Sequence, residues 1–547
     1  MDQKLDKLSQ NFLNYLMKSI PPLATQIGVH DYDEEMPQGD LKWMEDFMST
    51  RQKFFEDIRA IDPEKLSFDK KIDRGAVLNT FSVQIFEDEA HGRWKSHPQA
   101  QELLGLALHT LFIKEFAPFD ERIRRIAARL EKTPEFLEKS KELITDPVLL
   151  WVKMAANETS QLKGFITLIQ KTAEKEGVDE KIRARLNKAS ESAIEALAGY
   201  ERWLVTEKIP FARKDFAMGP ENFDKFIELR ELDMTTDEIY KFGEETLKHS
   251  REKLAEVAKK IAPDKTLKQV RKMMMENHPP TFEDVLREGQ KAVEESRQFV
   301  IDSGYVTLPE NEKLHIVETP GFLRELIPFG AYDPPGKFDE KQIGFYYMSP
   351  PINGDPSGLE IHNYGSILNT SVHEGYPGHH VQLVCANKNP SYSRMLTQGD
   401  EFAEGWAHYC EEAVANMGFC TELPSMFERY SDMAWRAVRI IVDVKLSRGE
   451  MTHSEAMDLI EEVAGFDRES CKMEVDRYTF TPGYQLSYLV GKQKIMDLRD
   501  YVEKKTGDKF SLRKFHDAML YAGTLPYKYI EKVVYHAFGL DKVEAGL

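Results

Sequence analysis

Apolar residues recur at helical spacing through residues 1 to about 300, and this periodicity restricts the chain to a largely helical fold. Capping chemistry marks two helix starts, because Thr133 stands directly before Pro134 and Thr235 precedes Glu238 by three residues. Helix ends are expected at Pro21 and Pro22, at Asp146 and Pro147, near Pro263 and at Gly304. The first half of the chain is therefore expected to form the helical walls of a cleft.

Residues 305–369 differ in character, since prolines and glycines are closely spaced around three short β-like runs, KLHIVE, IGFYYM and GLEIHNY. Runs of this kind predict a small sheet. One of the last two runs is a candidate edge strand that binds an extended peptide by strand addition. A structural hairpin is the equally weighted alternative.

The charge balance limits the partners. Asp and Glu number 92 against 73 Lys and Arg, a formal net charge of −19. Nucleic acids and anionic membranes require a basic surface, so neither is expected as a partner. The N-terminus predicts an amphipathic helix and no signal peptide, and no apolar run approaches the roughly 20 residues that span a bilayer. We expect a cytoplasmic protein, and the pattern does not indicate its oligomeric state.

The densest group of metal-capable side chains lies in residues 370–382, TSVHEGYPGHHVQ. The segment is a modified form of HExxH, in which two histidines four residues apart reach one zinc ion from one helix face. His373 and His379 are six residues apart, so a regular helix would place them on different sides. Pro377 has no N–H and Gly378 accepts unusual backbone angles, so both can form a two-residue bulge that restores a spacing of four.

The bulge argument makes His373 and His379 the expected metal ligands. His380 then supports the site or packs beside it, and His380 in place of His379 is the alternative ligand. Glu374 follows the first ligand directly and is expected to act as the base that activates a water molecule at the metal.

A third ligand is expected from EFAEGWAHYCEE, residues 401–412, because catalytic zinc usually has three protein ligands and one open position. Glu404 follows His379 by twenty-five residues, which is room for a turn and a second helix. Glu404, His408 and Glu411 share one helix face, so Glu411 can support a ligand from behind. Glu401, one turn earlier, is the competing ligand.

These motifs carry a family resemblance. HEGYPGHHVQ followed by FAEGWAHYCEE resembles the bacterial and archaeal family known as domain of unknown function 885, which is grouped with the zincin metallopeptidases. RAVRIIVD at 436–443, TPGYQLSYLVGK at 481–492 and FHDAMLYAGTLPYKYIEKVV at 515–534 also resemble it, as does PPLATQIGVHDYDEEMP near the N-terminus. The family keeps the histidine that matches His379 and allows tyrosine at the His380 position. Lys445 and Ser447 depart from the glycine and histidine that the family pattern implies.

The expected fold class is mainly α. We predict one family-spanning domain, 1–547, built as a large two-lobed helical body with a small sheet beside a zincin-type active-site helix and a cleft between the lobes. The approximate lobes are 1–304 and 305–547. No linker, low-complexity tract or repeat divides the chain.

Further site residues are expected in the C-terminal helices. By resemblance of its segment, Tyr488 is the candidate phenol donor to a developing oxyanion, and a core tyrosine is the alternative. Tyr484 and Tyr488 share one helix face, as do Tyr488 and Lys492. Lys492 or Arg439 is a candidate to bind a substrate carboxylate, which would make the enzyme a carboxypeptidase or dipeptidase. Arg439 and Asp443 alternatively form a helix-stabilising pair.

The leading functional hypothesis is a zinc-dependent metallopeptidase acting on short peptides, with Zn²⁺ as the cofactor. Two alternatives stay open. One is a metallohydrolase of a non-peptide amide or an acylated amino acid, which needs the same site chemistry. The other is a metal-stabilised binding protein without turnover. His–His–Glu ligand sets also bind cobalt or manganese, so the ligand types do not fix the metal.

Overall fold

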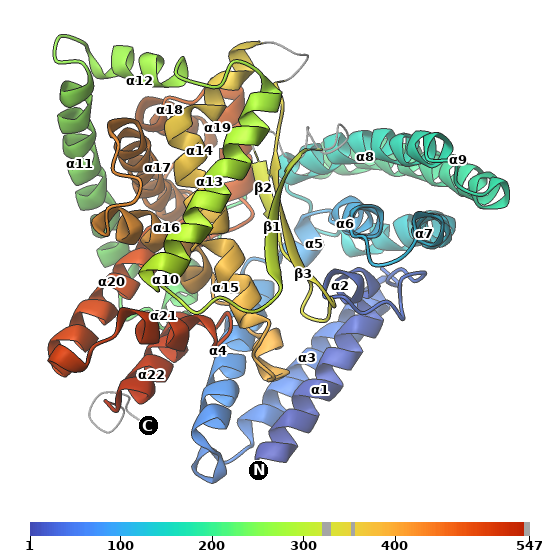
Figure 1. Cartoon of the computed structure of the whole chain (residues 1–547). Helices are drawn as coiled ribbons and strands as arrows, with labels where there is room; N and C mark the ends of the chain where they lie inside the picture. The colour runs from blue at the N-terminus through green and yellow to red at the C-terminus, as the bar shows by residue number, and fades with distance from the viewer. Residues whose placement is uncertain (320–329, 352–355, 541–547) are drawn as a thin grey trace. The chain divides into compact units, whose positions relative to one another are not determined.

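The computed structural model describes residues 1–319, 330–351 and 356–540. They form a mainly helical protein with one three-stranded sheet, as the periodicity predicted. The chain divides into two compact units (Figure 1). The first comprises Met1–Lys70, Phe81–Phe216 and Gly336–Glu340, and the second comprises Lys71–Thr80, Ala217–Pro335 and Lys341–Leu547. The main division therefore falls near residue 216, not at 304 where the sequence placed approximate lobes.

The first unit is helical throughout its described elements. Its helices are α1 (Asp2–Ser19), α2 (Pro21–Gln26), α3 (Leu41–Arg59), most of α4 (Phe68–Ala90), α5 (Arg93–Ser96), α6 (Ala100–Ile113), α7 (Phe119–Ser140), α8 (Leu149–Lys175) and α9 (Glu180–Trp203). The long helices α8 and α9 pack side by side (Figure 1). The predicted helix start at Thr133 and Pro134 was wrong, because Pro134 lies inside α7. Leu130, Phe136 and Leu137 are buried around it, and their packing holds the helix through the proline.

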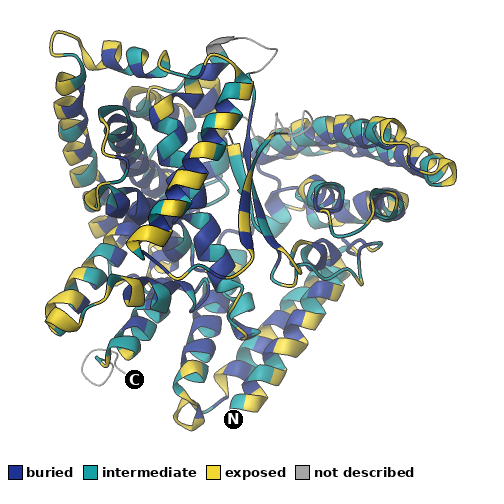
Figure 2. Cartoon of the chain, in the orientation of Figure 1, coloured by how far each residue is buried: buried dark blue, intermediate teal, exposed yellow. Residues whose placement is uncertain are grey.

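The second unit holds the other helices and the sheet. Its helices are α10 (Pro220–Leu229), α11 (Thr236–Ile261), α12 (Leu267–Met275), α13 (Phe282–Ser303), α14 (Tyr364–Thr370), α15 (His379–Ala386), α16 (Asp400–Asn416), α17 (Leu423–Arg448), α18 (His453–Ala464), α19 (Arg468–Tyr478), α20 (Ser487–Thr506), α21 (Leu512–Leu520) and α22 (Tyr527–Phe538). The predicted capping box forms at α11, where Thr235 Oγ1 accepts from the Glu238 N–H and Glu238 accepts from the Thr235 N–H. Gly304 ends α13 in a left-handed conformation. Figure 2 shows α13 with exposed residues along one face and buried residues along the other.

The sheet has the order β1-β3-β2, with β1 (Glu312–Glu318) parallel and β2 (Gly330–Asp333) antiparallel to β3 (Gln342–Met348). KLHIVE and IGFYYM form β1 and β3 as predicted. The prediction for GLEIHNY was wrong, because this run lies in the 3₁₀ segment Pro356–His362 and the start of α14. Asn363 caps α14 by accepting from the Ser366 N–H, which favours a helix there.

The sheet order also corrects the strand-addition expectation. β3 is the central strand, so both of its edges pair with neighbours, and GLEIHNY is not a strand. Neither of the two runs proposed for peptide binding can therefore accept a further strand.

Within the described ranges, no helix combines the length and the apolar character needed to cross a membrane.

Candidate metal centre

The HExxH-like segment is a break between two helices. α14 ends at Thr370 and continues as a π-helical turn, Ser371–Gly375, and α15 begins at His379. The residues between have a cis bond from Tyr376 to Pro377. The Tyr376 N–H donates to the carbonyl oxygen of Ser371 (3.2 Å), and the Gly378 N–H donates to the carbonyl oxygen of Val372 (3.0 Å). Three non-helical residues therefore replace the predicted two-residue bulge.

Gly378 permits the close approach of the two sides of this break. A Cβ atom at this position would lie 1.8 Å from the carbonyl oxygen of His373, so no other residue fits without a shift of the backbone. The indole N–H of Trp406 on α16 donates to the Pro377 carbonyl at 2.9 Å and ties the break to the next helix. The His373 and His379 rings come to a centroid distance of 4.9 Å at 83°.

His373, His379 and Glu404 offer one ligand atom each, and these atoms lie within 4.8 Å of one another. His379 Nε2 is 3.3 Å from Glu404 Oε2. Two ligands at zinc bond lengths of about 2.0–2.2 Å in a tetrahedron stand about 3.3–3.5 Å apart, so this pair fits one ion. The structure thus brings together the three residues that the sequence proposed as ligands.

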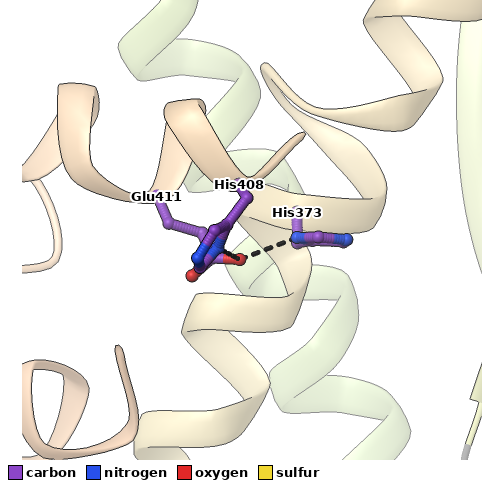
Figure 3. A group of neighbouring side chains, drawn as sticks. All are labelled: His373, His408 and Glu411. Atoms are coloured by element: carbon purple, nitrogen blue, oxygen red, sulfur yellow. Dashed lines mark hydrogen bonds and ion pairs between the residues drawn. The ribbon is translucent and has the colours of Figure 1, made fainter. Parts of the chain in front are cut away.

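Glu411 binds His373 through the ring nitrogen that is not the proposed metal ligand (Figure 3). Its Oε1 accepts from His373 Nδ1 at 2.7 Å, which leaves Nε2 of that ring for a metal. His408 Nδ1 lies 3.1 Å from the same oxygen. His373, His408 and Glu411 form a second group within metal-ligand distance, and the two groups share His373. We assign the support role to this second group, because Glu411 already occupies one nitrogen of His373.

The site concentrates negative charge. Burial opposes the charged form of Glu404, but His379 and the Tyr484 hydroxyl lower the pKa of its carboxyl to about 2. Burial also opposes the charge of Glu411, yet His408 and His373 hold its pKa well below the ordinary value. The pKa of His379 is raised against the effect of burial, chiefly by Glu404 and further by Glu374. A buried group of carboxylates that favours a positive partner suits a divalent cation.

His380 faces the sheet. Its Nδ1 is 2.9 Å from the Tyr332 hydroxyl on β2, and its Nε2 is 2.8 Å from Glu312 on β1. Glu312 also accepts from the Tyr376 hydroxyl and from Arg297. Both ring nitrogens of His380 are thus engaged, which favours His379 over His380 as the ligand. One carboxylate, Glu312, contacts both Tyr376 inside the break and His380 in the first turn after it.

Glu401, the competing ligand, forms an ion pair with Arg230 at 2.6 Å. Glu404 instead accepts a hydrogen bond from the Tyr484 hydroxyl. Tyr484 lies in the turn before α20, and Asp443 shapes this turn by accepting the N–H groups of residues 483, 485 and 486. Asp443 therefore positions Tyr484, the hydrogen-bond partner of the candidate ligand Glu404, in place of the predicted pairing with Arg439.

The candidate substrate residues differ in their surroundings. Lys492 Nζ forms an ion pair with Glu412 at 2.6 Å, so its charge is already balanced. Tyr488 packs edge-on against Tyr484 at 5.9 Å, and the Arg439 guanidinium lies 4.3 Å from its ring centre. Tyr488 therefore lies beside Tyr484, which contacts Glu404, and Arg439 lies against the Tyr488 ring, whereas Lys492 belongs to a separate ion pair.

Two glycines let the helices of the site touch. α16 carries Glu404 and α20 carries Tyr488, and the helices pack through Gly405 and Gly491. A Cβ atom at Gly491 would lie 1.8 Å from the Glu401 carbonyl oxygen, and one at Gly405 would lie 2.4 Å from the Gly491 carbonyl carbon. The backbones are thus in direct contact.

Sequence reasoning missed Glu312, Tyr332 and Tyr376. Glu312 and Tyr332 precede His380 by 68 and 48 residues, and no local pattern marks them. Tyr376 lies inside the motif, but the partner of its hydroxyl, Glu312, is on β1 and cannot be identified from the motif.

The chain matches one protein family and is similar to the solved structures of two other proteins. Residues 21–534 match a family described as "Bacterial protein of unknown function (DUF885)". A "putative lipoprotein of unknown function" from Shewanella oneidensis has a similar structure, with a TM-score of 0.78 and 22% identity over 97% of this chain and 99% of that one. A "putative lipoprotein" from Colwellia psychrerythraea has a TM-score of 0.84 and 17% identity over 98% and 99% of the two chains. No curated protein matches. The two structures show a shared fold over nearly the whole chain.

Proposed function

The chain belongs to the DUF885 family, and we propose that it is a zinc-dependent metallopeptidase of the zincin type that hydrolyses short peptides. The observation that supports this proposal is the convergence of His373, His379 and Glu404, with ligand atoms within 4.8 Å of one another. Glu411 adds support, since a carboxylate behind a histidine ligand is a common feature of zinc sites.

Zinc at this site would lower the pKa of a water molecule and polarise the carbonyl of the scissile bond. Glu374, next to the ligand His373 and half-buried, would take the proton of the attacking water and deliver it to the leaving nitrogen. The hydroxyl of the water joins the carbonyl carbon as the C–N bond breaks, so the products are a carboxylic acid and an amine.

Tyr488 is the proposed donor to the oxyanion. Burial raises the pKa of its phenol, so the hydroxyl keeps its proton and can donate it in a hydrogen bond. The predicted cleft, which would admit short peptides and exclude folded proteins, is part of the same proposal. The cytoplasmic location stays a prediction, and the descriptions of both structural neighbours contain the word lipoprotein.

The first experiment measures metal content by mass spectrometry in the wild type and in His379→Ala, His380→Ala and Glu404→Ala. We expect about one zinc per chain, lost in the His379 and Glu404 variants and kept in the His380 variant. Metal that survives all three changes, or that never binds after zinc addition, contradicts the proposed centre.

The second experiment incubates the zinc-loaded wild type and Glu374→Gln with a broad peptide library and reads the products by mass spectrometry. The wild type should cleave short peptides and the variant should bind zinc without cleaving. Cleavage of acylated amino acids alone would replace the peptidase by a metallohydrolase of those amides. Absence of every activity in the zinc-loaded wild type would favour a binding protein.

A further inference from the structure

α17 carries a group of buried hydrogen-bond donors without acceptors. Among the described residues, Arg436 Nε, Arg439 Nε and Trp435 Nε1 are buried and have no hydrogen-bond partner. Arg439 is 2% exposed and Arg436 is 9% exposed. Leaving buried N–H groups of this kind unpaired destabilises the fold, and more so when the group is charged. All three groups donate, so the missing partner is an acceptor.

The two guanidinium groups lie over the same two rings. The central carbons of Arg436 and Arg439 are 4.6 and 4.8 Å from the Trp435 ring centre, and 6.0 and 4.3 Å from that of Tyr488. The aromatic rings therefore hold two like charges in one buried place, where a bound anion would reduce their repulsion.

The neighbouring carboxylates do not saturate these arginines. Arg436 forms an ion pair with Asp432 at 3.0 Å. Glu474 lies 3.9 Å from Arg439 but only 2.9 Å from Arg477, and it accepts from the Tyr478 hydroxyl at 2.6 Å. Arg439 itself donates to Gln485 at 3.1 Å, which is a neutral acceptor. Three guanidinium groups thus share two carboxylates, Asp432 and Glu474.

The cluster is close to the candidate metal centre. Tyr488 contacts Arg439 on one side and Tyr484 on the other, and Tyr484 donates to Glu404. Burial opposes the charge of Arg439, but Tyr478, Tyr488 and Glu474 raise its pKa, and Glu404 contributes in the same direction. Arg439 is therefore charged at all accessible pH values, and only two tyrosine rings separate it from a metal ligand.

We propose that Arg436 and Arg439, with the Trp435 indole, bind the C-terminal carboxylate of the substrate. The inference rests on the proposed function and makes the enzyme one that cleaves within a few residues of a free C-terminus. A carboxylate is planar and accepts two parallel hydrogen bonds from a guanidinium, which an amide or ester terminus cannot match. Lys492 is paired with Glu412 and, unlike Arg436 and Arg439, has no unpartnered donor among the described buried atoms, so the two arginines are the better candidates.

Binding to the metal-free protein tests the carboxylate site without catalysis. The probes are N-acetylated dipeptides Ala-Ala, Ala-Phe, Ala-Lys, Ala-Glu and Ala-Pro, each as the free acid and as the C-terminal amide, measured by isothermal titration calorimetry. At least one acid should bind about 10–100-fold more tightly than its amide, as charge-assisted pairs of this kind contribute. Arg439→Gln and Arg436→Gln should remove the difference in affinity between acid and amide. Arg439→Lys keeps the positive charge but should lose most of this difference, because lysine cannot donate two parallel hydrogen bonds.

Two control variants separate recognition from stability. Arg394 is a half-buried arginine of the second unit, and Asp73 and the Ala522 carbonyl accept hydrogen bonds from it, so Arg394→Gln should lose stability but keep the preference for acids. Lys492→Met should keep it as well. Equal binding of acid and amide by the wild type, no binding of any acid at millimolar concentration, or a preference that survives both arginine-to-glutamine changes overturns the inference.

Hydrolysis of the same peptides by the zinc-loaded enzyme separates this inference from the proposed function. Cleavage without preference for free acids leaves the peptidase standing and removes the carboxylate site. Preferential binding of acids without cleavage of any peptide keeps the carboxylate site and removes the peptidase.

Discussion

Replacing Gly491 by alanine should destabilise the contact between α16 and α20, although alanine favours a helix. The new Cβ atom would lie 1.8 Å from the Glu401 carbonyl oxygen, and ordinary contact begins near 3.4 Å, so the two helices must separate by about 1.5 Å. Helix propensity alone would stabilise by about 1 kcal/mol. Overpacking costs about 1–3 kcal/mol in ordinary cores and here is at the upper end, because a carbonyl cannot move away by changing rotamer. The expected net loss is about 1–2 kcal/mol.

Gly199→Ala provides the matched control. Gly199 lies inside α9, and a Cβ atom there would meet nothing within 4 Å, so the substitution should stabilise α9 by about 0.5–1 kcal/mol. Hydrogen exchange read by mass spectrometry reports each helix separately. Gly491→Ala should accelerate exchange in α16 and α20, and Gly199→Ala should slow it in α9. If both substitutions slowed exchange in their own helices, the proposed backbone contact would be refuted.

Three further outcomes are expected. Glu411→Gln should weaken zinc binding about 10–100-fold, measured by competition with a chelator, because it removes the charged acceptor behind His373. Glu374→Gln should keep zinc affinity within a few-fold while peptide cleavage falls at least a thousandfold, and parallel loss of both would contradict the role as base. Burial lowers the pKa of His516 to about 3 from 6.5, so the unfolded chain binds the extra proton below pH 6.5 and stability falls as the pH falls. His516→Gln should therefore reduce the loss of unfolding free energy between pH 6.5 and 5 by about 2 kcal/mol, and an unchanged loss by denaturant titration would contradict it.

The sequence predicted those parts of the site that depend on local chemistry. The pairing of His373 with His379 follows from the inability of Pro377 and Gly378 to continue a helix, and Glu404 follows from helical spacing. The form of the break was not predictable, because its hydrogen bonds form only when α16 and the sheet are in place.

Other features were not predicted correctly, or not at all, from the sequence. GLEIHNY has strand-forming residues, but the Asn363 cap makes its end helical. Pro134 is a frequent first helical residue, yet buried neighbours on both sides keep it inside α7. The unpaired donor of Arg439 could not be inferred from spacing, since it depends on Glu474 lying nearer to Arg477 than to Arg439.

The contact of Glu312 with both Tyr376 and His380 limits how the site can be transplanted. A designer who copied residues 364–416 onto another helical scaffold would carry every proposed ligand but leave behind the carboxylate that joins Tyr376 in the break to His380 in the following helix. The transferable module is therefore α14, α15 and α16 together with β1, the strand that carries Glu312. A graft that includes Glu312 should show an ordered break by NMR, and the shorter graft should not.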